Sequence, residues 1–247
     1  MKNTGNTILV TGGSSGIGRE YAKRWHDAGN TVIVAARSED GLRETAEGRE
    51  NLHWLELDVA DEASIDQFAQ TVRERFPDVN VLVNNAGIMP FENISGSRDL
   101  SDAEKVVAIN LLGPIRLTNA LIDHLKSKDD AAIVNVSSGL AFVPLPKAPT
   151  YSATKAALHS YTMTLRKVLE GKVEVIEIVP PGVQTDLTPG QANNDQYMPL
   201  DDFIDESFGL LQQTPTPREV CVEQVKAFRH AEENGKTAEL IDMLADR

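Results

Sequence analysis

Cysteine is almost absent from this sequence: Cys221 is the single one among 247 residues. A lone cysteine cannot form a disulfide within the chain, and scarce cysteine is typical of proteins from a reducing compartment. Residues 1–6 contain no apolar stretch of the kind found in signal peptides, and no apolar run is long enough to span a membrane. We therefore expect a cytoplasmic protein that does not bind membranes.

Basic residues are outnumbered by acidic ones. Lys and Arg total 24 against 37 for Asp and Glu, which gives a formal net charge of -13 at pH 7. Because an acidic surface repels phosphate backbones, we expect no nucleic-acid partner. Histidine is also sparse, and its positions lack the spacing of metal ligands, so we expect no metal site. These positions are His26, His53, His124, His159 and His230.

The sequence does contain a regular alternation of short apolar runs and amphipathic segments. Continuous apolar strands that alternate with helices indicate a parallel sheet covered on both faces. We therefore predict a single α/β domain over residues 1–247, doubly wound and Rossmann-like, with a mainly parallel sheet of six strands. The predicted strands lie at 7–10, 31–35, 52–57, 79–83, 131–136 and 173–179, and the clearest helical patterns lie at 19–28, 102–125 and 151–169.

A hydroxyl, a phenol and an amine occur close together between two of these elements. Ser138 follows the apolar run that ends at Val136, and Tyr151 and Lys155 are four residues apart in a helical pattern. Positions i and i+4 share one face of a helix, so both side chains can enter the same cleft. A neighbouring ammonium lowers the pKa of a phenol and lets it exchange a proton with a carbonyl or alcohol oxygen. The alternative is a solvated Tyr and Lys on a helix surface.

Glycines gather where the first strand turns into the first helix, in Thr11-Gly-Gly-Ser-Ser-Gly-Ile-Gly18. Glycine at such a turn lets the backbone approach a pyrophosphate, and the N-terminus of the helix supplies free amides. A plain tight turn is the alternative. The position of this glycine segment after the first strand of an alternating α/β chain favours a nucleotide site.

The end of the second strand, Val34-Ala35-Ala36-Arg37-Ser38, determines which nucleotide we expect. A carboxylate there would accept a hydrogen bond from the 2′-hydroxyl of NAD, whereas an arginine accommodates the 2′-phosphate of NADP. Arg37 and Ser38 therefore predict a preference for NADP(H) over NAD(H). The alternative is an arginine turned toward solvent.

Together these motifs resemble the short-chain dehydrogenase/reductase family in its single-domain form. The matching residues follow the family's order and spacing between residues 7 and 187. They are the glycine turn 11–18, Asp58, Asn84-Asn-Ala-Gly87, Asn110, Ser138, Tyr151, Lys155 and Thr185. The C-terminal part resembles, more weakly, reductases encoded beside teichoic-acid D-alanylation genes.

The resemblance implies a catalytic role for four residues. Tyr151 would be the acid/base, Lys155 would lower its pKa and bind the nicotinamide ribose, and Ser138 would hold the substrate carbonyl. Asn110 would hold a water molecule in a proton relay. The alternative is that Asn110 only forms local hydrogen bonds within its helix. The interval to Tyr151 favours Ser138 over Ser137.

The resemblance also implies a cofactor site along one cleft. Asp58 and Val59 would meet the adenine, residues 85–87 would pack beside the adenosine ribose, and Val183 and Thr185 would anchor the carboxamide. The alternative for Asn84-Asn85 is a simple turn. The full expected set is Gly12, Ser14, Ser15, Gly16, Ile17, Gly18, Arg37, Ser38, Asp58, Val59, Asn85, Ala86, Gly87, Tyr151, Lys155, Pro181, Val183 and Thr185.

Two features depart from the family pattern. Pro181 stands where relatives carry a glycine after the sixth strand, which removes a backbone donor and predicts a stiffer loop. From Pro217 to Arg247 the apolar positions fit helices, so we expect a helical extension in place of a seventh strand. Since that strand helps build a tetramer in many relatives, its absence favours a homodimer through helices 102–125 and 151–169.

By this resemblance the chain divides into parts with different tasks. Residues 1–100 form mainly the cofactor half, residues 101–186 the catalytic half, and residues 187–247 a substrate lid and C-terminal helices. The lid is expected within 187–213, which is rich in Pro, Gly, Asn and Asp. The alternative for the C-terminal part is ordinary helical covering of the sheet.

The expected reaction is hydride transfer between NADP(H) and a carbonyl/alcohol pair, with Tyr151 as acid/base. Residues 140–149 should line the pocket and are mostly apolar, which favours a neutral hydrophobic ketone or aldehyde; Lys147 would instead suit an acidic substrate. One rival function is a nucleotide sensor without catalysis, which the retained Tyr151 and Lys155 disfavour. An epimerase or dehydratase usually carries a larger substrate domain, for which this chain offers no segment.

Overall fold

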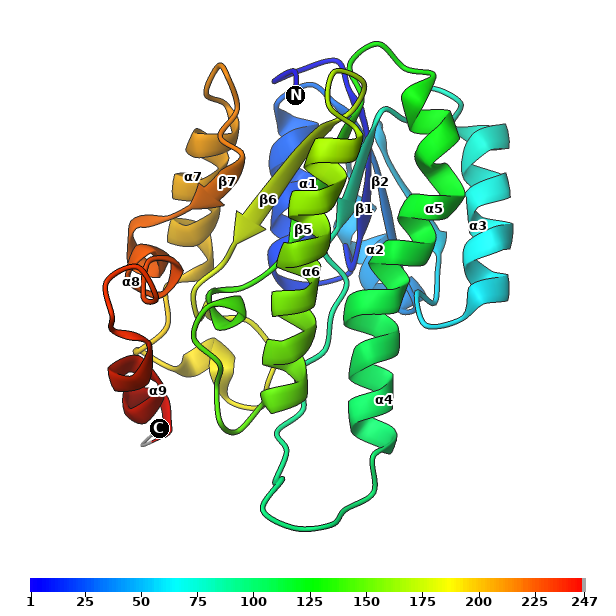
Figure 1. Cartoon of the computed structure of the whole chain (residues 1–247). Helices are drawn as coiled ribbons and strands as arrows, with labels where there is room; N and C mark the ends of the chain where they lie inside the picture. Colours follow the sequence, from blue (N-terminus) through cyan, green and yellow to red (C-terminus); the bar gives the residue numbers. More distant parts are fainter. Residues whose placement is uncertain (246–247) are drawn as a thin grey trace.

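Seven parallel strands form the central sheet, in the order β3-β2-β1-β4-β5-β6-β7 (Figure 1). This computed structural model describes residues 1–245. The chain runs from β1 to β3 on one side and then crosses to β4 on the other, so the order reverses between β1 and β4, where ligands bind in such sheets. The strands are β1 (Thr7–Thr11), β2 (Thr31–Ala36), β3 (Leu52–Glu56), β4 (Val81–Asn84), β5 (Ala132–Val136), β6 (Glu174–Val179) and β7 (Glu219–Cys221).

The seventh strand corrects the prediction of six strands and a wholly helical C-terminal part. β7 pairs in parallel with β6, with Glu177 opposite Glu219 and Ile178 opposite Val220. It has only three residues, too few for an alternating pattern to be distinguished from a helical one. The homodimer was expected because a seventh strand was thought to be absent. Since β7 is present, that argument no longer applies.

Helices cover both faces of the sheet. Apolar residues of α1, α2 and α7 belong to one core cluster, and those of α3, α5 and α6 pack in a second cluster on the opposite face. The short helices α8 and α9 lie below β7 (Figure 1). The bounds are α1 (Gly16–Asp27), α2 (Glu39–Ala46), α3 (Glu62–Arg75), α4 (Ser101–Val107), α5 (Gly113–Lys126), α6 (Pro149–Val168), α7 (Leu200–Leu211), α8 (Lys226–Arg229) and α9 (Thr237–Ala245), with single 3₁₀ turns at Gly139–Ala141, Gln191–Asn193 and Glu223–Val225.

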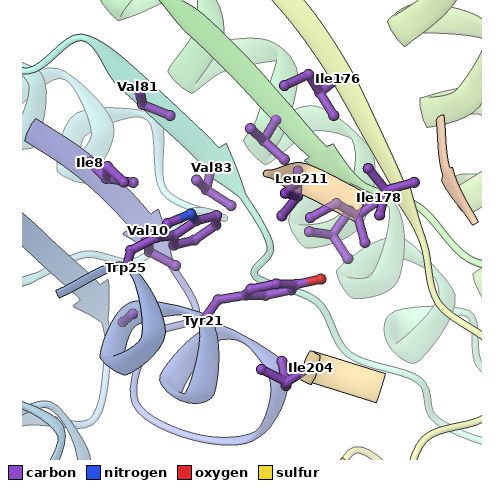
Figure 2. Close-up of a cluster of buried hydrophobic side chains, with 14 of the residues drawn as sticks. Ile8, Val10, Tyr21, Trp25, Val81, Val83, Ile176, Ile178, Ile204 and Leu211 are labelled. Carbon is purple, nitrogen blue, oxygen red and sulfur yellow. The ribbon is translucent and has the colours of Figure 1, made fainter. Parts of the chain in front are cut away.

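The first core cluster fixes the helix that follows the glycine turn. Tyr21 and Trp25 of α1 stack with ring centroids 5.0 Å apart and lie over the strands of the sheet (Figure 2). The Tyr21 hydroxyl is 2.5 Å from the Ser207 hydroxyl of α7. Each large apolar side chain buried in this way contributes about 2 kcal/mol, so α1 and its N-terminus are held firmly against the sheet.

The helix α7 belongs to this core, which restricts the predicted lid. Phe203, Ile204 and Leu211 are buried in the same cluster as α1. The lid within residues 187–213 stays a prediction, and α7 inside this range is packed in the core. The part that remains beside the cavity is the loop before it.

The predicted helix 102–125 is continuous from Ser101 to Lys126 but contains one wide turn. Residues Ala108–Leu112 form a π-helical turn between α4 and α5, a feature frequent at functional sites. By length and composition alone this helix could cross a membrane. Its buried side chains, such as Leu117 and Leu121, instead pack against the sheet, as in the interior helix of a folded domain.

Candidate active site

A cavity of about 630 Å³ opens at the carboxyl ends of β1 and β4. All eighteen residues predicted to bind the cofactor line this cavity, and so does Ser138. The glycine turn and the Tyr151–Lys155 helix line the same cavity although they are far apart in the sequence. The structure therefore brings the predicted residues together, while their individual roles remain predictions.

The glycine turn packs tightly against the end of β4. A β-carbon on Gly18 would lie 2.4 Å from both Asn85 Nδ2 and the Gly12 carbonyl oxygen, and one on Gly12 would lie 2.8 Å from Asn85 Nδ2. Gly16 has a φ of +51° and opens α1, whose N-terminus borders the cavity. Free amides and the positive end of a helix dipole suit a diphosphate, so the turn fits a dinucleotide.

The other end of the cavity contains the residues expected to select the cofactor. Arg37 is exposed and follows β2, and it has no ion pair among the described residues. The Ser38 hydroxyl accepts a hydrogen bond from the Gly41 amide and so caps α2. Asp58 Oδ1 accepts from the Ala60 amide at 3.0 Å. A free guanidinium at this end is available for an anionic group.

Ser138, Tyr151 and Lys155 meet at the inner end of the cavity. Ser138 lies two residues after β5, and its Oγ accepts a hydrogen bond from the Leu140 amide at 3.1 Å. The Ser138 side chain also lies close enough to the Tyr151 phenol to lower the pKa of that phenol. Lys155 Nζ donates to the Val136 carbonyl at 2.7 Å and lies 5.6 Å from the centre of the Tyr151 ring.

Burial controls the protonation of both helix residues. It raises the pKa of Tyr151 to about 12, while the hydrogen bond with Ser138 lowers it. It lowers the pKa of Lys155 to about 8, while the charge of Glu177 raises it. The predicted lowering of the phenol's pKa is therefore not found, because desolvation of the buried phenolate outweighs the favourable contact.

Asn110 lies in the π-helical turn and links two elements of the site. Its Oδ1 accepts from the Ile88 amide, and its Nδ2 donates to the Ile88 carbonyl, both at 2.9 Å. A β-carbon on Gly87 would lie 3.4 Å from Asn110 Oδ1 and 3.8 Å from Lys155 Nζ. The Asn110 side chain thus holds the segment after β4 beside Lys155. Its hydrogen bonds to Ile88 reach outside its own helix.

Ser137, the rival of Ser138, also lines the cavity, but its hydroxyl has a different partner. Its hydroxyl donates to the Ile178 carbonyl of β6 at 3.4 Å and is buried. Asn84 is likewise not in a turn. It ends β4, and its Nδ2 donates to Asn135 Oδ1 at 2.8 Å inside the sheet. Both residues join strands to one another.

Several residues near the site were not predicted. Gln191 lines the cavity, and its Nε2 donates to the Val183 carbonyl at 2.7 Å and the Thr185 hydroxyl at 3.2 Å. A single Gln in a polar loop carries no sequence signal for such a role. His159, Glu177 and Glu219 bring ligand-type atoms within 4.8 Å of one another, a grouping that spacing along the chain cannot reveal.

Comparisons with known proteins agree with this geometry. A family profile described as short chain dehydrogenase matches residues 6–196. An uncharacterized oxidoreductase named DltE from Bacillus subtilis is 45% identical over 76% of this chain and 75% of its own length. Sulfoacetaldehyde reductase 2 from Chromohalobacter salexigens is 34% identical over 76% and 77%. Among solved structures, a short-chain dehydrogenase from Streptomyces avermitilis has a TM-score of 0.82 at 27% identity, covering 96% of this chain and 95% of its own.

Proposed function

Because the chain belongs to the short-chain dehydrogenase/reductase family, we propose that it transfers a hydride between NADP(H) and a carbonyl/alcohol pair. The observation that carries the proposal is the meeting of Ser138, Tyr151 and Lys155 in a cavity that also contains the glycine turn. A bound nicotinamide supplies or accepts the hydride. The working substrate in the reductive direction is a ketone or aldehyde.

The side chains supply the proton chemistry. With a pKa near 12, Tyr151 is protonated at neutral pH and can give its proton to the carbonyl oxygen as negative charge develops there. Ser138 donates a hydrogen bond to the same oxygen. The Lys155 ammonium lies close enough to favour the phenolate that Tyr151 leaves behind. Asn110 holds the segment after β4 in place.

The preference for NADP(H) rests on Arg37, an exposed cation without an ion pair among the described residues. Solved proteins of this fold contain either cofactor: one from Brucella melitensis is complexed with NADH and one from Shigella flexneri with NADP. The choice is therefore a property of individual residues and not of the fold. A phosphate oxygen is well matched to a guanidinium, which supports NADPH here.

The substrate is proposed to be neutral and hydrophobic. Leu140 and Leu145 are only partly buried and pack against the small cluster that contains Tyr151, so apolar surface lies beside the tyrosine. A relative at 34% identity is named a reductase of sulfoacetaldehyde, which supports an aldehyde or a ketone as the class. Lys147 is exposed, as expected for a solvated lysine.

A substrate panel tests this function. Oxidation of NADPH and of NADH is followed with neutral ketones, aldehydes and acidic carbonyls, for the wild type and for Tyr151→Phe. We expect turnover with NADPH and a neutral carbonyl, and a loss of at least about 100-fold in the variant with unchanged NADPH affinity. Tight NADPH binding with no turnover of any carbonyl would favour the nucleotide sensor.

We also propose a cytoplasmic homodimer formed by the outer faces of α4–α5 and α6. Leu112, Met163 and Val168 are exposed on these helices, and exposed apolar side chains favour association. This support is independent of the seventh strand. A dimeric mass by light scattering would agree with it, and a tetrameric mass would contradict it.

A further inference from the structure

A buried carboxylate lies behind the catalytic lysine. Glu177 on β6 has no exposed surface, and its two oxygens lie 2.8 and 3.0 Å from His159 Nδ1. His159 follows Lys155 by four residues on α6, so both side chains point from the same helix face toward the sheet. Glu177, His159 and Lys155 therefore occupy one interface between α6 and the sheet.

The strand register places Glu177 beside the anchor of the lysine. Lys155 Nζ donates to the carbonyl of Val136 on β5. β5 and β6 are neighbours, with Asn135 opposite Glu177 and Val136 opposite Ile178. The ammonium thus lies over the pair of strands that carries the carboxylate. Glu177 raises the pKa of Lys155 against the larger effect of burial.

A buried ammonium needs an opposite charge, because removing an unpaired ion from water costs several kcal/mol. Glu177 is the one carboxylate whose charge acts on Lys155 within residues 1–245. The other polar or titratable groups around the lysine carry no negative charge at neutral pH. They are Tyr151 and His159 on α6, Asn110 in the π-helical turn and Ser138 after β5.

We propose that Glu177 is a positioning residue for Lys155: it is the buried countercharge of the ammonium, and His159 fixes its carboxylate. The proposal rests on the reductase function above and adds a residue to it. Glu177 does not line the cavity, so its proposed effect on the reaction passes through the lysine. Its effect is to keep Lys155 charged while Tyr151 gives up its proton.

A metal ion is the competing explanation for the group His159, Glu177 and Glu219. Each candidate ligand already has a partner in this structure. His159 Nδ1 faces both oxygens of Glu177, and Glu219 accepts from the guanidinium of Arg229. The ligand-type atoms of this group are therefore already engaged in two separate pairs.

The first test compares pH profiles of kcat for carbonyl reduction. Glu177→Gln removes the charge and keeps the shape, so the ammonium should lose its proton at lower pH. We expect the alkaline fall in activity to move toward acid by at least about half a pH unit. Glu177→Asp keeps the charge, so its profile should stay close to that of the wild type. Glu219→Gln is the matched control: it removes the neighbouring carboxylate on β7 and should leave the profile in place.

The second test does not need activity. Unfolding free energies of the wild type, Glu177→Gln, Lys155→Met and the double variant form a cycle that isolates the coupling between the two side chains. We expect favourable coupling that weakens as pH rises through about 8, where the buried lysine loses its charge. The same cycle with Glu219→Gln should give no such pH-dependent coupling. If the wild type reduces no carbonyl, the proposed function fails while this cycle still tests the pair.

A further variant covers the case in which Glu177→Gln does not fold. Glu177→Leu with His159→Leu replaces the whole pair by apolar side chains, an exchange that buried pairs often tolerate, and it should show the same acid shift. Two results would refute the proposal that Glu177 is the countercharge. One is an equal shift of the pH profile of kcat in Glu177→Gln and Glu219→Gln. The other is an unshifted profile in Glu177→Gln together with zero coupling free energy between Glu177 and Lys155. Stoichiometric Zn²⁺ binding by calorimetry that Glu177→Gln abolishes would also refute it, because it would assign the group to a metal.

Discussion

Lys155 Nζ donates a 2.7 Å hydrogen bond to the carbonyl of Val136, the last residue of β5. This bond ties α6 to the strand that leads directly into Ser138. A shift of α6 along the sheet would therefore break the bond and separate Tyr151 from the hydroxyl it contacts. The relative placement of Ser138, Tyr151 and Lys155 is therefore a consequence of how α6 packs on β5.

The protonation of Lys155 predicts opposite pH effects on activity and stability. Because the pKa of the lysine is lowered to about 8, reduction should slow as pH rises through that value. Between pH 8 and the unfolded value of 10.5, the unfolded chain holds a proton that the folded one has released. The contribution of Lys155 to the free energy of unfolding should therefore rise by about 3 kcal/mol between these two pH values.

The measurement is the unfolding free energy of the wild type minus that of Lys155→Met, followed from pH 7 to 10.5. The subtraction removes other titrating groups, such as Cys221, whose pKa burial raises to about 11. Activity that falls while this difference rises would exclude unfolding as the cause of the loss. A difference that stays flat would mean that the lysine keeps its proton throughout.

Replacing one of two adjacent serines should separate catalysis from structure. Ser138→Ala removes a hydroxyl that contacts Tyr151 and should lower kcat about 100-fold. Ser137→Ala is the matched control, because its hydroxyl bonds the Ile178 carbonyl within the sheet. We expect Ser137→Ala to cost about 1 kcal/mol of stability and little activity. Equal losses of kcat would contradict the assignment of Ser138.

The motifs predicted residues that line one cavity, because most of them follow the end of a strand. Once the parallel sheet was predicted, the glycine turn after β1 and Ser138 after β5 had to meet at the same edge. Tyr151 and Lys155 followed from the period of a helix. Local spacing and one topological rule were therefore enough to find the cavity.

Features set by burial and by distant contacts were missed. β7 has three residues and forms only because β6 offers an open edge for Val220. The raised pKa of Tyr151 depends on how completely the fold excludes water, which no pattern of residues reports. The pair Glu177 and His159 joins a strand to a helix, eighteen residues apart, without a recognisable motif.

Arg37 should determine the choice of cofactor. Arg37→Asp replaces the free cation with a carboxylate, which would repel a 2′-phosphate and accept a hydrogen bond from a 2′-hydroxyl. We expect the ratio of kcat/KM for NADPH over NADH to fall by at least about 10-fold. Arg43→Asp carries the same change of charge on α2, but Arg43 pairs with Glu39 and does not line the cavity. An unchanged ratio in Arg37→Asp would show that the arginine faces solvent.

Gly18→Ala should damage the cofactor cradle through sterics alone. The added β-carbon would lie 2.4 Å from Asn85 Nδ2 and from the Gly12 carbonyl oxygen, and backbone on one side cannot move away freely. We expect a loss of about 1–3 kcal/mol in stability and weaker NADPH binding, measured by thermal unfolding with and without NADPH. Gly209→Ala in α7 is the control, since a β-carbon there meets no atom within 4 Å and the helix gains from alanine. If both variants bound NADPH like the wild type, the close contact between the glycine turn and β4 would not be what shapes the site.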